Sequence, residues 1–68
     1  MPLVEVFDRE NALQPLFVAE FSFLPRPGEY LSQDAGGYFQ YYNVLEVWHR
    51  QDTANAPFQA CIRVRLSD

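Results

Sequence analysis

The chain has 68 residues, 49% of them hydrophobic and 16% aromatic, and a formal net charge of −4. A chain this short forms a single domain, residues 1–68, that buries only about 60% of the surface its unfolded form exposes, so it depends on dense packing or a partner chain. One cysteine and one histidine exclude an internal disulfide and the usual four-ligand zinc site, and we expect no metal and no cofactor.

Apolar and polar residues alternate with a period of two along most of the chain, which is typical of β-strands. Residues 2–8 predict a first strand, and residues 13–24 predict a second one that begins near Pro15, at a sheet edge or a bulge. Between them, the polar stretch 9–12 predicts a hairpin loop, with a single helical turn as the alternative. The second strand carries Phe17, Ala19, Phe21 and Phe23 on one face and Leu16, Val18, Glu20, Ser22 and Leu24 on the other.

The stretch "PRPGE" at 25–29 predicts a turn, because its prolines fix φ at about −65° and Gly28 can adopt a positive φ. A short strand at 30–33 and a flexible hairpin connection at 34–37 follow. The next residues, 38–50, predict a long strand.

Residues 51–57 are polar and predict a loop, and residues 58–66 predict a last strand with the cleanest alternation in the chain. Five strands joined by short loops predict an all-β fold, a small five-stranded antiparallel barrel or half-barrel. The expected core consists of Phe21, Phe23, Val44, Val47, Ile62, Val64 and Leu66.

The strand at 38–50 contains four aromatic residues in five positions, from Tyr38 to Tyr42. Strict alternation would leave both of its faces half apolar, which a sheet solvated on one side does not show. One explanation is a β-bulge near Leu45–Glu46, which would place Tyr42, Val44, Val47 and His49 on one inner face. The other explanation is that a second protein chain covers the outer face. In both cases some aromatic surface stays outside the core.

Two segments carry a recognisable signature, "LPRPGEYL" at 24–31 and "YYNVLEVWHR" at 41–50. Together they resemble small SH3-like barrels of uncharacterised proteins from bacteria and mobile elements, of the phage or integron gene cassette type. In that pattern a Pro-Arg-x-Gly-Asp/Glu turn precedes a strand of the form Tyr-x-Val-x-x-Val-x-His. The matching residues here are Pro25, Arg26, Gly28 and Glu29 in the turn, and Tyr42, Val44, Val47 and His49 in the strand. The resemblance implies an SH3-like barrel and names no partner.

The lone histidine is the first candidate for chemistry, since His49 with Glu46, Asp52 or Glu29 could form an acid–base pair. No nucleophile, metal site or glycine-rich phosphate loop accompanies it. We therefore favour a histidine at a strand end that packs on an aromatic ring, and we expect neither catalytic residues nor an enzyme.

The single cysteine is the second candidate. Cys61 lies near Arg63 and Arg65, which could lower its pKa if all three faced solvent, but a small residue on a sheet face or in an interface is the favoured interpretation. One free thiol, no signal peptide and no run of about 20 apolar residues predict a cytoplasmic protein without membrane contact.

Arginines beside aromatic residues resemble a stacking platform for single-stranded nucleic acid and equally the anchors of a protein interface. The negative net charge and the absence of lysine favour a protein partner. We expect a non-enzymatic protein-interaction module that self-associates as a homodimer, with a nucleic-acid-binding barrel as the alternative. The expected interface residues are Tyr38, Phe39, Tyr41, Trp48, Arg63 and Arg65. In the competing explanation, loop 51–57 folds back and covers the aromatic cluster within one chain.

Overall fold

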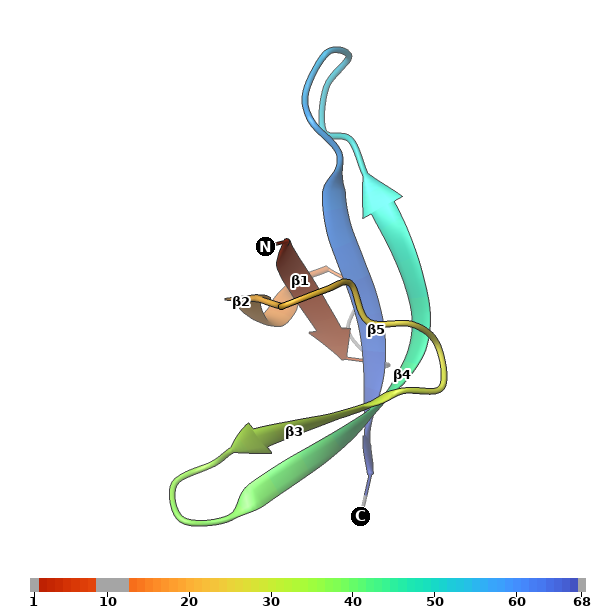
Figure 1. Cartoon of the computed structure of the whole chain (residues 1–68). Helices are drawn as coiled ribbons and strands as arrows, with labels where there is room; N and C mark the ends of the chain where they lie inside the picture. Colours follow the sequence, from red (N-terminus) through yellow and green to blue (C-terminus); the bar gives the residue numbers. More distant parts are fainter. Residues whose placement is uncertain (1, 9–12, 68) are drawn as a thin grey trace.

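The structure, a computed structural model, describes residues 2–8 and 13–67 (Figure 1). Its five strands are β1 (Leu3–Asp8), β2 (Pro15–Glu20), β3 (Tyr30–Asp34), β4 (Phe39–Arg50) and β5 (Gln59–Ser67). All five expected strands are present, and the second ends at Glu20, earlier than expected. The predicted hairpin loop at 9–12 lies outside the described residues. Over the part of the chain that is described, no helix has the length and apolar character needed to cross a membrane.

The strands form one sheet in the order β2-β1-β5-β4-β3. Neighbours pair antiparallel except β1 and β5, which pair in parallel. The expectation of a purely antiparallel sheet is therefore wrong. The physical reason is simple: the chain reverses direction between successive strands, so the first and fifth strands run the same way. A sheet that makes them neighbours must pair them in parallel.

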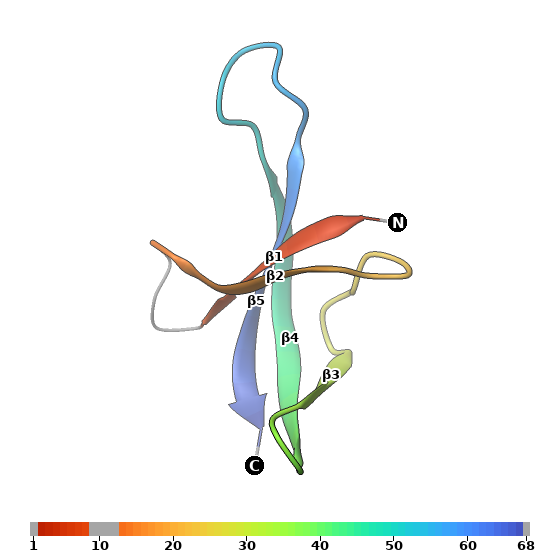
Figure 2. The same cartoon turned by 90° about the vertical axis from the view of Figure 1, so that its left-hand side faces the viewer.

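The sheet curls into a half-barrel with β2 and β3 as its two edge strands (Figures 1 and 2). Residues 21–29 lead from the end of β2 to the start of β3. The Gly28 N–H donates to the Val44 carbonyl and the Val44 N–H donates to the Glu29 carbonyl, both at 2.9 Å. Gly28 has a φ of +92°, which confirms the turn predicted at 25–29.

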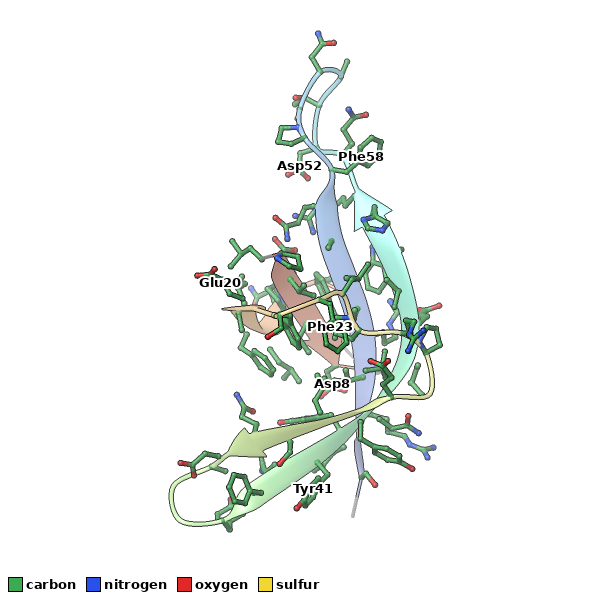
Figure 3. The ribbon with its side chains drawn as sticks, in the orientation of Figure 1. Asp8, Glu20, Phe23, Tyr41, Asp52 and Phe58 are labelled. Carbon is green, nitrogen blue, oxygen red and sulfur yellow. The ribbon has the colours of Figure 1, made fainter. Side chains whose placement is uncertain are left out.

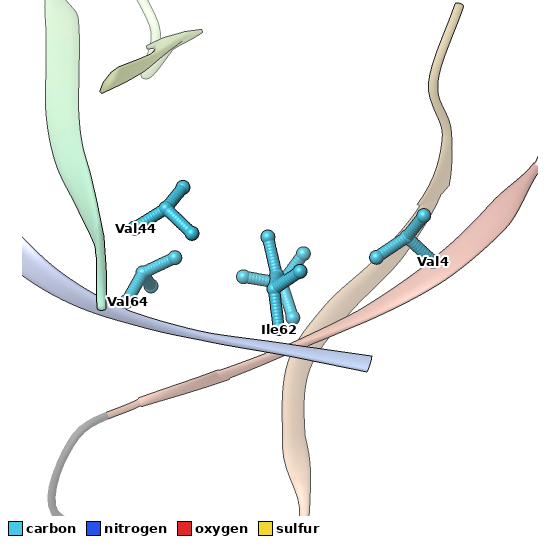
Figure 4. Packing of buried hydrophobic residues seen from close by; sticks show 5 residues of the cluster. Val4, Val44, Ile62 and Val64 are labelled. Atoms are coloured by element: carbon cyan, nitrogen blue, oxygen red, sulfur yellow. The ribbon is translucent and has the colours of Figure 1, made fainter. Parts of the chain in front are cut away.

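The core lies on the inner, concave face of the sheet. Five of its side chains, each at most 1% exposed, form one cluster: Val4, Val6, Val44, Ile62 and Val64 (Figure 4). Partly buried side chains that pack against the cluster are Phe17, Phe21, Leu24, Leu31, Tyr42, Val47 and Ala60. The predicted burial of Val44, Ile62 and Val64 is confirmed, and Phe21 and Val47 contact the cluster.

Two residues of the expected core are exposed. Leu66 is 52% exposed because it lies beyond Val64, the last β5 residue that faces β1. Phe23 is 68% exposed because β2 ends at Glu20, so that the alternation of the strand does not continue to it. Both predictions were wrong because they extended an alternating pattern too far: past the last residue that pairs with β1 for Leu66, and past the end of β2 itself for Phe23.

The pairing register between β4 and β5 shifts between Val44 and Glu46. Val44 faces Val64 and Val47 faces Ile62, so Leu45 is an extra residue on β4. This confirms the bulge predicted near Leu45–Glu46. Two residues three positions apart share the inner face, which regular alternation forbids.

Candidate interaction surface on the outer face of the sheet

The outer face is the side of the sheet opposite the core, and the bulge determines which side chains of β4 reach it. On either side of the bulge, alternation places Tyr41 and Trp48 on the outer face, although they are an odd number of positions apart. Phe39 shares this face, as do Arg63 and Arg65 of the neighbouring strand β5. The structure therefore brings five of the six expected interface residues to one face.

Three aromatic side chains form what we call the outer aromatic patch: Tyr30, Phe39 and Tyr41. Tyr30 faces Asn43 and Tyr41 faces Ser32 in the β3–β4 ladder, so the two tyrosines are diagonal neighbours, a spacing that aromatic side chains bridge. Tyr30 is 66% exposed, Phe39 61% and Tyr41 50%. Tyr38, the sixth expected residue, is also exposed and precedes β4 in the adjoining hairpin loop.

The loop between β4 and β5 does not cover this patch. Figure 3 places Asp52 of that loop and Tyr41 at opposite ends of the molecule. The loop is held near its own strand ends, since Arg50 Nε lies 2.8 Å from Asp52 Oδ1 and Gln51 Nε2 donates to the Ala56 carbonyl at 2.8 Å. The explanation in which loop 51–57 folds back over the aromatic cluster is therefore wrong.

Trp48 and Arg63 belong to a second cluster on the same face. The ring centroids of Trp48 and Phe7 are 5.4 Å apart, and the Arg63 guanidinium carbon lies 5.2 Å from the Trp48 ring centroid, close enough for a cation–π interaction. Arg63 also forms an ion pair with Glu46. Trp48 is half-buried, and it and Arg63 already have partners within the chain. The rings of the outer aromatic patch pack on no other ring among the described residues.

A third group of side-chain contacts on the outer face joins β4 to β1. Arg50 Nη1 and Nη2 donate to the two carboxylate oxygens of Glu5 at 2.6 and 3.0 Å. The hydrogen bonds from Arg50 to Glu5, and then to Asp52, raise the pKa of the guanidinium above its usual range. Cys61 is fully buried beside this pair, and its Sγ lies 3.8 Å from Arg50 Nη1. Burial raises the pKa of the Cys61 thiol, which opposes a role as a reactive thiolate.

The histidine is isolated from the acidic side chains that could have formed an acid–base pair with it. His49 is exposed, and no hydrogen bond or ion pair links it to another described residue. Within residues 2–8 and 13–67, no group of three or more His, Cys, Asp and Glu side chains is placed to hold a metal ion.

The described arginines fall into two classes. Three form ion pairs: Arg26 with Glu29, Arg50 with Glu5 and Asp52, and Arg63 with Glu46. Arg65 is exposed, faces Asn43 across the ladder and forms no ion pair with any other residue that the structure describes. Sequence reasoning missed the pairing of Glu5 with Arg50, because these residues meet only once β1, β5 and β4 are known to be neighbours.

Comparison of the chain with family models, with curated proteins and with solved structures finds no match. The functional assignment therefore rests on the geometry of this face.

Proposed function

We propose that the protein is a non-enzymatic interaction module that self-associates as a homodimer through the outer aromatic patch, with Tyr38 and Arg65 at the border of the interface. One observation carries the proposal: Tyr30, Phe39 and Tyr41 share a face and are each at least half exposed. A large aromatic side chain buries about 150–250 Å², and one side of a standard interface measures about 800 Å². Monomers rarely leave such a contiguous apolar surface in water.

The patch is suited to a second copy of itself. A two-fold interface brings the same surface of each protomer together, so that surface must be self-complementary. The side chains of Tyr30, Phe39 and Tyr41 are themselves neutral, although Asp34 faces Phe39 in the ladder and the chain as a whole carries −4. Tyrosines and phenylalanines also pack well on one another in offset or edge-to-face arrangements.

A nucleic-acid partner is the alternative, and two observations weigh against it. Arg26, Arg50 and Arg63 already pair with carboxylates in the chain. The net charge of −4 further reduces the phosphate attraction on which such binding depends. Among the described arginines, Arg65 alone forms no ion pair, and one such arginine beside aromatic rings fits the border of a protein interface better.

Kinship with SH3-like barrels is part of the same proposal. Its support is that the turn of the signature has the required geometry, with Gly28 at positive φ and Arg26 bonded to Glu29 at 3.1 Å. The valines of the signature strand, Val44 and Val47, both lie on the inner face. We place the protein in the cytoplasm, where its single thiol would remain reduced.

Sedimentation velocity over the micromolar concentration range tests the homodimer. We expect a concentration-dependent dimer for the wild type and a monomer for Tyr41→Glu, with an unchanged β-sheet circular dichroism spectrum. Phe58→Glu is the matched control, because Phe58 is 66% exposed and immediately precedes β5, outside the patch. The control should remain dimeric. A wild type that stays monomeric throughout would contradict the proposal, and binding of oligothymidine that weakens steeply with salt would favour the alternative.

A further inference from the structure

The half-barrel is open on one side, between its edge strands β2 and β3, and this opening is not flat. Two adjoining hollows of about 360 and 230 Å³ lie there. Phe21 and Leu31 line both of them, and Phe17 and Ala19 line the larger one. We call this opening the β2–β3 groove; both of its edge strands are seen in Figure 2. Tyr30 also borders both hollows, so the groove adjoins the outer aromatic patch, but Phe17, Ala19 and Leu31 belong to the inner face.

The edge strands that border the groove have free backbone groups. No described strand pairs with β2 on the side away from β1, or with β3 on the side away from β4. A free strand edge presents N–H and C=O groups that accept another strand, and proteins usually block it with lysine, proline or a bulge. Here Pro15 and the register shift near it guard only the start of β2, and the chain has no lysine. The edge at 17–20 is left open.

The side chains of β2 complement an added strand. Phe17 and Ala19 point to the inner face, and Val18 between them points outward and is 48% exposed. A strand placed beside β2 would direct every second side chain into the hollow against Phe17, Ala19 and Leu31, since the side chains of a strand alternate between faces. The ring of Phe17 lies 6.4 Å from that of Tyr42, so Phe17 is held by an aromatic neighbour on the inner face.

The charge of the groove indicates the chemistry of its occupant. Its lining contains two carboxylates, Glu20 and Glu29, and no basic residue. Glu29 is compensated by Arg26, whereas Glu20 forms no ion pair within the described part of the chain. The uncompensated charge at the end of β2 favours a basic side chain and disfavours a second copy of this acidic chain. The two hollows, of about 360 and 230 Å³, suit individual side chains, whereas a complete second copy would have to bring a folded sheet into the opening.

From these observations we infer that the β2–β3 groove binds an extended segment of a partner protein, with apolar residues alternating with polar ones and at least one arginine or lysine, as an added strand on β2. Main-chain hydrogen bonds to the edge of β2 would supply affinity, and the hollow and Glu20 would supply specificity. This inference rests on other observations than the self-association proposed above, although Tyr30 borders both surfaces.

The test uses an acetylated and amidated eight-residue peptide in which valine alternates with serine and arginine. Backbone amide shifts are recorded by NMR on the full chain carrying Tyr41→Glu, so that the outer aromatic patch is disabled. We expect saturable shifts at Phe17, Val18, Ala19 and Leu31. A peptide with glutamate in place of arginine should bind at least about tenfold more weakly, a difference of about 1.4 kcal/mol. A peptide with N-methyl groups on the backbone edge that faces β2 should not bind.

A variant of the protein separates charge recognition from folding. Glu20→Gln should reduce the preference for the basic peptide over the acidic one, because it removes the carboxylate that attracts arginine. The variant should still fold, because Glu20 forms no ion pair with any other residue that the structure describes. Asp52→Asn removes one charge from the loop between β4 and β5 (Figure 3), which does not line the groove, and should leave the preference unchanged.

Three results would overturn the inference. The first is that neither peptide shifts the amides of β2 at a concentration of about 1 mM, which would place any dissociation constant well above the millimolar range. The second is equal affinity for the basic, acidic and N-methylated peptides. The third is a change at β2 on raising the protein concentration alone, because a second copy would then occupy the groove.

Discussion

Arg50 on β4 forms a two-bond ion pair with Glu5 on β1, across the intervening strand β5. The pair spans the parallel β1–β5 junction, which joins the β1–β2 hairpin to the remaining three strands. It also covers Cys61, which is fully buried although it lies on the outer face. The outer face therefore has a small buried site of its own at Cys61, and the ion pair between Arg50 and Glu5 covers this site.

Replacing Glu5 with Gln should lower the thermal midpoint, because it removes the charge that ties β4 to β1 and leaves Asp52 as the described carboxylate that still pairs with Arg50. The loss should shrink as salt is added, since ions screen partly exposed charges. A double-mutant cycle with Arg50→Gln measures the coupling of the pair. Equal effects of Glu5→Gln in the presence and absence of Arg50 would show that the pair contributes nothing to stability.

Ile62 and Leu66 lie on the same strand, and only the first should matter for stability. Ile62 is fully buried in the core cluster, so Ile62→Ala should reduce the free energy of unfolding by about 2–5 kcal/mol. Leu66 is 52% exposed, and Leu66→Ala should cost less than about 1 kcal/mol. Urea unfolding followed by circular dichroism measures both. Comparable losses would mean that the side chain of Leu66 is buried in solution as deeply as that of Ile62.

Alternation predicted the strands, prolines and Gly28 predicted the turn at 25–29, and a break in alternation gave the bulge on β4 as one of two explanations. These features are local: the bulge follows from the conflict between the faces of 38–50, and the turn follows from Gly28 between its neighbours. The parallel β1–β5 pair was not predicted, because no local pattern states which strands become neighbours. The burial of Val4 and Val6 follows from that same pairing, which encloses β1 between β2 and β5.

The candidate interaction surface, like the fold, was predicted only in part. The exposure of Tyr38, Phe39 and Tyr41 agrees with the surplus of aromatic residues in the sequence. The contact of Trp48 with Phe7 could not be anticipated, since it too depends on the neighbours of β5. The β2–β3 groove was not predicted either, because a groove between two edges appears only when the sheet order is known.

Gly28 should tolerate only residues that adopt positive φ. Its φ is +92°, and a Cβ at this position would have no atom within 4 Å, so the cost of substitution comes from the backbone and not from crowding. Gly28→Ala should cost about 1–2 kcal/mol, and Gly28→Asn should cost less, because asparagine enters the left-handed region more readily. Chemical denaturation ranks the three proteins. A stability of Gly28→Ala equal to that of the wild type would show that the turn relaxes to negative φ.

Cys61 should be unreactive in the folded protein. Burial raises the pKa of its thiol, the nearby Arg50 opposes this shift, and Glu5 and Asp52 add to it. The neutral thiol is therefore favoured in the folded state. Because the folded pKa lies above the unfolded one, the contribution to stability is complete below the unfolded pKa of about 8.5 and is lost as the pH rises through the folded value.

Two measurements follow for Cys61. Reaction with a disulfide reagent at pH 8 should be at least about tenfold slower in buffer than in denaturant, because the thiolate is the nucleophile and the folded chain both buries and protonates it. Above about pH 8.5, the wild type should lose stability with rising pH more steeply than Cys61→Ala, which lacks the group that titrates. Rapid labelling of the native protein, together with identical pH profiles for the two chains, would place Cys61 at the surface and remove the buried site beneath Glu5 and Arg50.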